Sequence, residues 1–237
     1  MNMKHKAPKK RRQPIFFFVR AFFSIFLKST VESEIDVIPE NAIIVANHSA
    51  KSGPMAIEVS YPHFNVKWGA YQMMEGYRSR FLYLRNVLYR QKLGRGRVYS
   101  SIKAFFEAIP SKMLYRGMKF IPTYPDARFR HSIRLSIEVL ENGGSILVFP
   151  EDSSKGYLDE LTSAFPGFVM LAEQYLRKTG VDLPIIPMYF SRSERRIIVG
   201  KPSYAGELRK KGMSREGVAD FMKDEINSLY RRYIKKN

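Results

Sequence analysis

Short apolar runs alternate with segments of helical periodicity along most of the chain. The helical segments carry apolar residues every three or four positions, as in the stripe of Phe129, Ile133, Ile137 and Leu140. A chain in which strands and helices alternate predicts an α/β fold, with a mainly parallel, mixed sheet flanked by helices. Six runs have the length and apolar character of buried strands: 42–46, 64–70, 118–122, 145–149, 184–190 and 195–200.

The first 35 residues follow another pattern and are predicted to be a membrane-attachment segment. Six Lys and Arg residues between positions 4 and 12 precede an apolar run from Ile15 to Leu27. That run is shorter than the ~20 residues a spanning helix needs. Arg20, Ser24 and Lys28 fall on one side of it, which is typical of an amphipathic helix lying in the membrane interface. We expect peripheral or monotopic attachment to the cytoplasmic face of a membrane through anionic lipid; a helix buried in a soluble core is the alternative.

The charge balance points to an anionic partner. The chain has 40 Lys and Arg against 22 Asp and Glu, a formal net charge of +18. Nucleic acid, anionic lipid and a phosphorylated substrate are all compatible with such a charge. The stretch from Arg78 to Lys103 concentrates it, with eight basic residues, no acidic one and interleaved tyrosines, and is predicted to be largely helical. Because the chain contains no cysteine, disulfides, thiolate catalysis and cysteine-ligated metals are excluded.

One of the four histidines stands where chemistry is expected. His48, in "VANHSAKSGPMA", follows an apolar strand and precedes a helix start at Gly53, whereas His5, His63 and His131 have no such position. The ends of strands are where α/β sheets gather their ligands. No metal site is expected, because no second histidine or cysteine lies at ligand spacing.

Four stretches together resemble a known family. "NHSAKSGP", "FIPTYPDAR", "VFPEDSSKG" and "LPIIPMYF" occur in the order and spacing of the four sequence blocks of the glycerolipid acyltransferases, the lysophosphatidic acid (1-acylglycerol-3-phosphate) acyltransferase family. The resemblance runs from Ile43 to Pro202. It implies an enzyme that moves an acyl chain from a coenzyme A or acyl carrier protein thioester to a hydroxyl of a lysophospholipid or glycerol phosphate. No cofactor beyond the acyl donor is expected, and residues 36–237 would form the acyltransferase-like α/β domain.

The resemblance also implies residue roles. His48 matches the histidine that acts as general base, which fits the ability of an imidazole to take a proton from an attacking hydroxyl. Glu151 matches the third-block glutamate that helps hold the acceptor, and Asn47 matches an asparagine that often precedes the histidine. Lys51 and Ser153 are expected to complete the substrate-binding residues near these blocks.

Three departures from the family pattern shape the expectations. Gly53 stands where the family has an aspartate that orients the histidine, and loss of such a carboxylate in a comparable triad costs ~10⁴ in rate. Asp152 is our first choice as its substitute. Glu58, Asp126 or a backbone carbonyl are the other candidates.

The second-block arginine is replaced by Thr123, so Arg128 or Arg130 is expected to reach the acceptor phosphate. The third block has Asp152, Ser153 and Ser154 in place of glycine, threonine and arginine. These departures leave two alternatives: a catalytically inactive, lipid-binding relative and a basic nucleic-acid-binding protein. Since four blocks in order are an improbable coincidence, no nucleic-acid partner is expected.

Overall fold

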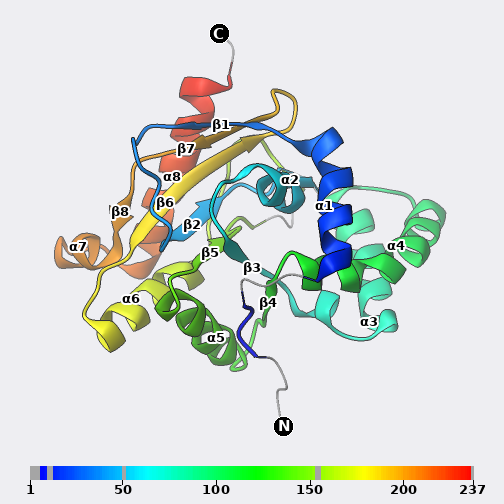
Figure 1. Ribbon diagram of the computed structural model, residues 1–237, viewed down its shortest axis with the longest axis horizontal. Coiled ribbons are helices and arrows are strands. Elements are labelled where there is room, and N and C mark those ends of the chain that lie inside the picture. Colours follow the sequence, from blue (N-terminus) through cyan, green and yellow to red (C-terminus); the bar gives the residue numbers. More distant parts are fainter. Residues whose placement is uncertain (1–5, 10–12, 50–51, 153–155, 236–237) are drawn as a thin grey trace.

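The computed structural model describes residues 6–9, 13–49, 52–152 and 156–235. Within these ranges the chain forms one eight-stranded sheet with helices on both faces (Figure 1). The strand order is β1-β7-β6-β2-β5-β3-β4, and β8 pairs with β6. The strands are β1 (Thr30–Ser33), β2 (Ile43–Ala46), β3 (Asn65–Ala70), β4 (Phe120–Thr123), β5 (Ser145–Val148), β6 (Pro184–Ser191), β7 (Arg196–Val199) and β8 (Ser203–Tyr204). The helices are α1 (Pro14–Leu27), α2 (Gly53–Ser60), the 3₁₀ helix η2 (Tyr71–Met74), α3 (Tyr77–Leu82), the π-helix η3 (Tyr83–Lys92), α4 (Arg97–Gly117), α5 (Phe129–Glu141), α6 (Gly167–Thr179), α7 (Ala205–Lys210) and α8 (Arg215–Tyr233).

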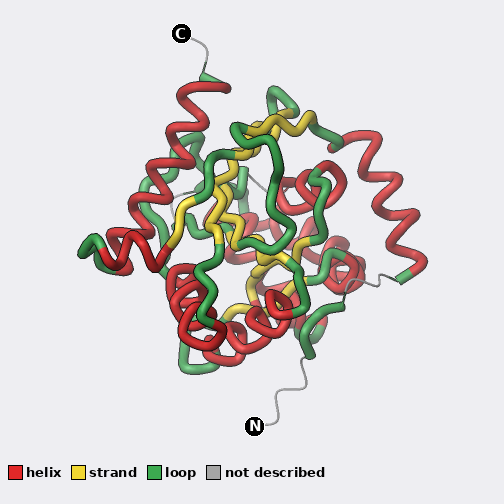
Figure 2. The backbone as a smooth tube through the Cα atoms, turned by 60° about the vertical axis from the view of Figure 1, so that its left-hand side comes forward, coloured by secondary structure: helices red, strands yellow, loops and turns green. Residues whose placement is uncertain are grey.

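The predicted α/β fold with a mainly parallel, mixed sheet is confirmed. Strands β6, β2, β5, β3 and β4 run parallel to one another. Strand β7 runs antiparallel to β6, and β1 runs parallel to β7. Every residue of β2 and β5 is buried, as expected for strands covered on both faces. Figure 2 shows the strands gathered in the middle of the molecule with helices around them.

Two short strands, β1 and β8, were not among those predicted from the sequence. Strand β1 reads TVES, in which Val31 is the one large apolar residue, so it lacks the apolar run that marks the buried strands. It lies within the first 35 residues, yet Thr30 pairs with Arg196 and Val31 with Ile197 at the edge of the sheet. The chain from Thr30 onward is therefore part of the α/β fold.

The two faces of the sheet bury separate cores. Alternate residues of β2 divide between them, because side chains of a strand point to opposite faces in turn. Ile43 and Val45 pack on the face covered by α5, α6 and α8. Ile44 and Ala46 pack on the face covered by α2.

A charged side chain lies within this packing. Lys67, in β3, is fully buried, and its ammonium donates to Glu58 Oε2 at 2.6 Å and to Asn65 Oδ1 at 2.9 Å. A buried ammonium needs such partners, because desolvating an unpaired charge is costly. Glu58 lies on α2, and its backbone carbonyl accepts a bond from Arg20 Nε of α1 at 3.2 Å. One network therefore joins α1, α2 and β3.

Helix α1 buries one side and exposes the other. Phe16 is buried against the end of α4, so closely that a Cβ on Gly117 would lie 2.0 Å from its ring. Arg20, from the predicted polar stripe, contacts α2, so the outer side of α1 is mainly apolar. Its exposed large residues are Ile15, Phe17, Phe18, Phe22, Ile25 and Phe26. No helix in the described part of the chain is long and apolar enough to cross a bilayer, and attachment through α1 stays a prediction.

Residues 71–117 form a helical lobe between β3 and β4. The lobe consists of η2, α3, η3 and α4, which confirms the helical prediction for Arg78 to Lys103. Because β3 is parallel to β2 and β5, the lobe starts at the edge of the sheet where those strands also end. The buried residues of its core are Met73, Leu84, Leu88, Tyr89, Ala104 and Ala108.

Candidate functional site

The first and third sequence blocks meet at the carboxyl edge of the sheet. Val45 of β2 pairs with Val148 of β5, and His48 and Glu151 each lie three residues further on. The register therefore predicts that they lie side by side, and the backbone N–H of His48 donates to Glu151 Oε1 at 3.2 Å. Two residues separated by 103 positions in sequence thus form the centre of the candidate site.

Asn47 locks the end of β2 onto β6. Its side-chain nitrogen donates to the carbonyl of Phe190 at 3.0 Å, and its side-chain oxygen accepts from the Phe190 N–H at 2.7 Å. The amide is buried and both of its ends are used by backbone, which gives Asn47 a structural task. These two bonds fix the position of Asn47, and therefore of the backbone that leads into His48. Contact of Asn47 with substrate stays a prediction.

The imidazole of His48 lies between two aromatic rings. Its ring centroid lies 4.9 Å from that of Tyr157, in a stacked arrangement with an interplanar angle of 27°. On another side the ring of Phe149 lies at 4.8 Å. These contacts restrain the plane of the imidazole, and neither aromatic residue was predicted as part of the site.

Glu151 is held in a largely buried position. It forms an antiparallel bridge with Ala164, and the N–H of Phe165 donates to the carbonyl of Pro150 at 2.8 Å. Burial raises the pKa of Glu151 to about 7, and the His48 N–H and the charge of Lys92 act in the opposite direction. The carboxyl can therefore exchange a proton near neutral pH, which is common at functional sites.

Lys92 is a cation of the site that the sequence did not single out. It ends η3, and its ammonium lies 5.5 Å from the centroid of the Tyr157 ring that stacks on His48. Burial lowers the pKa of Lys92, while the charges of Glu151 and Asp152 raise it. In the sequence it is one of eight cations in the basic stretch, with nothing to set it apart. Lys92 is the last residue of a π-helix, and π-helical segments are frequent at functional sites.

Arg128 lies further along the same edge. It follows β4, which is three strand spacings from β2, or ~14 Å in the hydrogen-bonding direction. Its guanidinium binds both carboxylate oxygens of Asp126 and lies over the rings of Tyr71 and Tyr124, at 5.0 and 4.5 Å from their centroids. Contact of Arg128 with the acceptor phosphate stays a prediction.

The remaining predicted site residues are placed as follows. Asp152 is exposed, next to Glu151, and its role in orienting His48 stays a prediction. Glu58, one of its alternatives, is buried with Lys67. Lys51 and Ser153 lie outside the described residues. In the described ranges, no group of three or more histidine and carboxylate side chains is placed to hold a metal ion.

Gly53 has a steric reason for being glycine. A Cβ at this position would lie 2.1 Å from the carbonyl oxygen of His48, closer than any real contact allows. Gly53, the first residue of α2, therefore lies directly against the backbone of His48. The aspartate that the resemblance leads one to expect would have no room at this position.

No protein-family description matches this chain, and no characterised protein is significantly similar to it in sequence. Among solved structures, it is similar to the crystal structure of the 1-acyl-sn-glycerophosphate (LPA) acyltransferase PlsC from Thermotoga maritima. The two share 16% identity with a TM-score of 0.48, over 96% of this chain and 86% of that one.

The tightness of the turn can be tested by adding a single methyl group. Gly53→Ala is expected to destabilise the protein by several kcal/mol, because either the His48 carbonyl or α2 has to move. Gly76→Ala is the control, since a Cβ there meets no atom within 4 Å. Urea denaturation of both variants measures the difference. Equal stability of the two would show that the turn accommodates a side chain.

The raised pKa of Glu151 predicts how stability depends on pH. An unfolded glutamate titrates near ~4.3, so between that pH and about 7 the folded protein binds more protons than the unfolded one. Stability should therefore fall as pH rises from about 4 to about 7, with Glu151 contributing up to about 3 kcal/mol of the loss. Denaturation curves across this range should show a shallower decline for Glu151→Gln. Identical pH profiles would contradict the assignment.

Proposed function

We propose that this protein is an O-acyltransferase of the lysophosphatidic acid acyltransferase type, acting on a phosphorylated glycerolipid. The observation that carries the proposal is the pairing of His48 with Glu151 at the carboxyl edge of the sheet. These two residues come from the first and third sequence blocks, whose order and spacing resemble that family. The acyl donor would be a coenzyme A or acyl carrier protein thioester.

In the proposed reaction His48 acts as general base. As the acceptor hydroxyl attacks the thioester carbonyl, its proton passes to the imidazole, a step worth about 10²–10⁴ in rate. The tetrahedral intermediate carries an oxyanion, which N–H groups near the start of α2 can stabilise. Collapse then breaks the C–S bond and leaves a C–O ester, and the imidazolium returns the proton to the departing thiolate.

Contacts of the described residues suit this role for the histidine. Stacking on Tyr157 and packing against Phe149 limit rotation of the ring, which lowers the entropy lost in reaching the reactive geometry. Asp152, beside Glu151 at the same edge, is proposed to accept the second N–H of the imidazole and so to fix its tautomer.

Lys92 is the cation best placed to receive the acceptor phosphate. Its ammonium lies over the Tyr157 ring that stacks on the proposed base, and its charge acts to lower the pKa of Glu151. The guanidinium of Arg128, in contrast, already binds the carboxylate of Asp126. We therefore assign the acceptor headgroup first to Lys92 and second to Arg128.

The proposed setting is the cytoplasmic face of a membrane. The acceptor is a membrane lipid, and the exposed apolar side of α1 would lie at the headgroup boundary of an anionic bilayer. A second candidate function is favoured by Gly53: a lipid-binding relative that has lost the orienting carboxylate and does not turn over. The first test below separates the two.

Removing the base should abolish acyl transfer without unfolding the protein. We expect His48→Ala to lower kcat by at least about 10²-fold, measured with labelled acyl-CoA and acyl carrier protein against a panel of lysophospholipids and glycerol 3-phosphate. His63→Ala is the control, since His63 lies in the α2–β3 connection, with Glu40 at 3.7 Å. Transfer by His48→Ala at the wild-type rate would refute the catalytic role. Wild-type protein that binds lysolipid but transfers no acyl chain would support the inactive relative.

The headgroup assignment predicts a change in acceptor affinity. Lys92→Met keeps the aliphatic stem but removes the charge, so the KM for the acceptor should rise about tenfold or more. The KM for the donor should change little. Arg90→Met, an exposed cation on the same helix, controls for the loss of general positive charge. If Arg128→Ala raises the acceptor KM and Lys92→Met does not, the phosphate belongs to Arg128.

A further inference from the structure

Helix α4 turns its large apolar residues outward. Val98, Ile102, Phe105, Phe106 and Ile109 fall on one side of the helix, and they are 73%, 54%, 51%, 63% and 60% exposed. Such spacing normally marks the buried stripe of a helix. A contiguous exposed patch of this kind is uncommon on a soluble monomer and indicates a binding surface.

The inner side of α4 explains why the arrangement is stable. The residues that face the lobe are small: Ser100, Ala104, Ala108 and Ser111 are all buried. They let α4 pack closely on η3, and the core of the lobe is completed by Leu84, Leu88 and Tyr89. The large outward residues of α4 are thus not part of the buried core of the lobe. They are available to contact another surface.

Cations border the first half of this outward stripe. Arg95, Arg97 and Lys103 are exposed beside it, and Arg95 lies 5.9 Å from the ring centroid of Tyr99. Lys103 also lies 3.9 Å from the carboxylate of Glu107 on the same helix. The stretch from Arg78 to Lys103 contains no acidic residue. An apolar stripe bordered by cations complements an anionic lipid surface, where the side chains enter the acyl boundary and the cations meet headgroups.

Two other occupants fit less well. A second copy of this chain would bring two stripes bordered by cations together, in a protein of net charge +18, so that like charges would repel. Nucleic acid would need aromatic rings free to stack on bases. In this stretch Tyr89 is buried, with its hydroxyl bonded to Glu107. Tyr99 is 48% exposed, but its ring already contacts Tyr89 and Arg95.

Helix α4 also meets the other exposed apolar helix. Gly117 at its end contacts Phe16 of α1, and both helices lie on the same side of the molecule in Figure 1. The end of α4 is therefore packed against the buried side of α1.

We propose that α4 is a membrane-contact surface in its own right, which inserts its apolar stripe into the interface of an anionic bilayer. The proposal goes beyond the predicted attachment through the first 35 residues, because α4 lies in the lobe next to the site. It rests on the proposed function only in the choice of lipid as the partner. Binding to vesicles is measurable without any acyl transfer.

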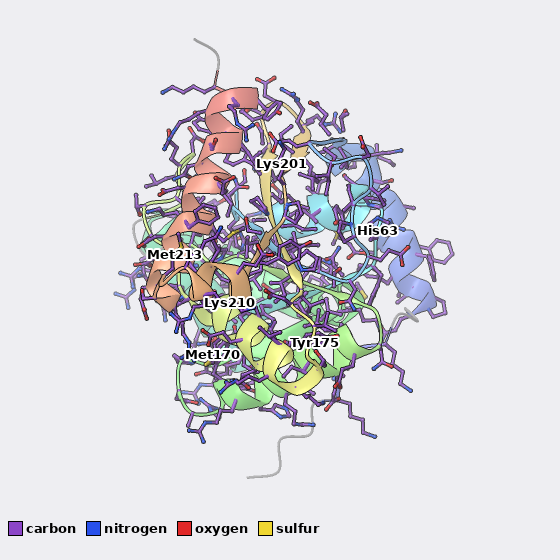
Figure 3. The ribbon with its side chains drawn as sticks, turned by 90° about the vertical axis from the view of Figure 1, so that its left-hand side faces the viewer. His63, Met170, Tyr175, Lys201, Lys210 and Met213 are labelled. Atoms are coloured by element: carbon purple, nitrogen blue, oxygen red, sulfur yellow. The ribbon has the colours of Figure 1, made fainter. Side chains whose placement is uncertain are left out.

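The test uses full-length protein and vesicles of phosphatidylcholine, with or without phosphatidylglycerol. Ile102→Asp and Phe106→Asp should each lower the partition coefficient onto anionic vesicles about tenfold, equivalent to about 1.4 kcal/mol. Val181→Asp is the matched control, with the same charge change at a residue that is 53% exposed. Val181 follows α6, whose Met170 and Tyr175 are labelled in Figure 3, on the side away from α4. The control should bind as the wild type does.

Further variants separate the contribution of α4 from that of α1 and from self-association. Phe18→Asp removes an exposed residue of α1, and adding Phe106→Asp to it should weaken binding further if α4 contributes independently. Equal partitioning of the Phe106→Asp variant and the wild type would overturn the proposal. A dimer that Phe106→Asp dissociates, in sedimentation equilibrium, without any change in vesicle binding, would assign the stripe to a second copy. Phe106→Asp can also be added to the His48→Ala variant. The same loss of vesicle binding there would support α4 as a membrane-contact surface independently of acyl transfer.

Discussion

The arrangement of the site depends on one fully buried lysine. Lys67 lies inside the sheet, and its charge is compensated by Glu58 from α2 at 2.6 Å and by Asn65 at 2.9 Å. An unpaired charge there would cost several kcal/mol, so α2 has to present Glu58 to β3. The pairing of Glu58 with Lys67 therefore fixes the position of α2. The first residue of that helix, Gly53, lies against the backbone carbonyl of His48. Arg20 binds the same residue of α2, so α1 is held against that helix by the same network.

The sequence predicted the strands that build the site because their signal is local. Each is an apolar run, and His48 and Glu151 follow paired positions of two such runs, so the strand register alone brings them together. Lys92 and Tyr157 carried no comparable signal, since neither continues a strand and their neighbourhood exists only after the lobe has packed. The burial of Lys67 could not be predicted from the sequence either. A single lysine within an apolar run gives the same sequence pattern whether its side chain is exposed or buried with a partner.

Gly53 stands where the family resemblance leads one to expect an aspartate, so the imidazole of His48 is held differently from that pattern. A carboxylate restrains the ring, fixes its tautomer and stabilises the imidazolium. At Gly53 a side chain would collide with the carbonyl of His48, so this position supplies none of the three. The rings of Tyr157 and Phe149 restrain the plane of the imidazole, but stacking does not itself select a tautomer. In the proposed reaction Asp152 would serve the other two functions.

The lobe would place the proposed reaction beside a membrane surface. Its η3 helix ends at Lys92, over the ring that stacks on His48. Helix α4 begins shortly afterwards, at Arg97, and its outward apolar stripe begins at Val98. A lipid acceptor has a polar head and an apolar tail. In the proposed arrangement Lys92 would receive the head, and the apolar stripe of α4 would lie among the tails. Because η3 and α4 pack on one small core, a bilayer in contact with α4 would stay in fixed register with the site. The same rigid lobe would thus set both the depth of the protein in the interface and the place where the headgroup meets the base.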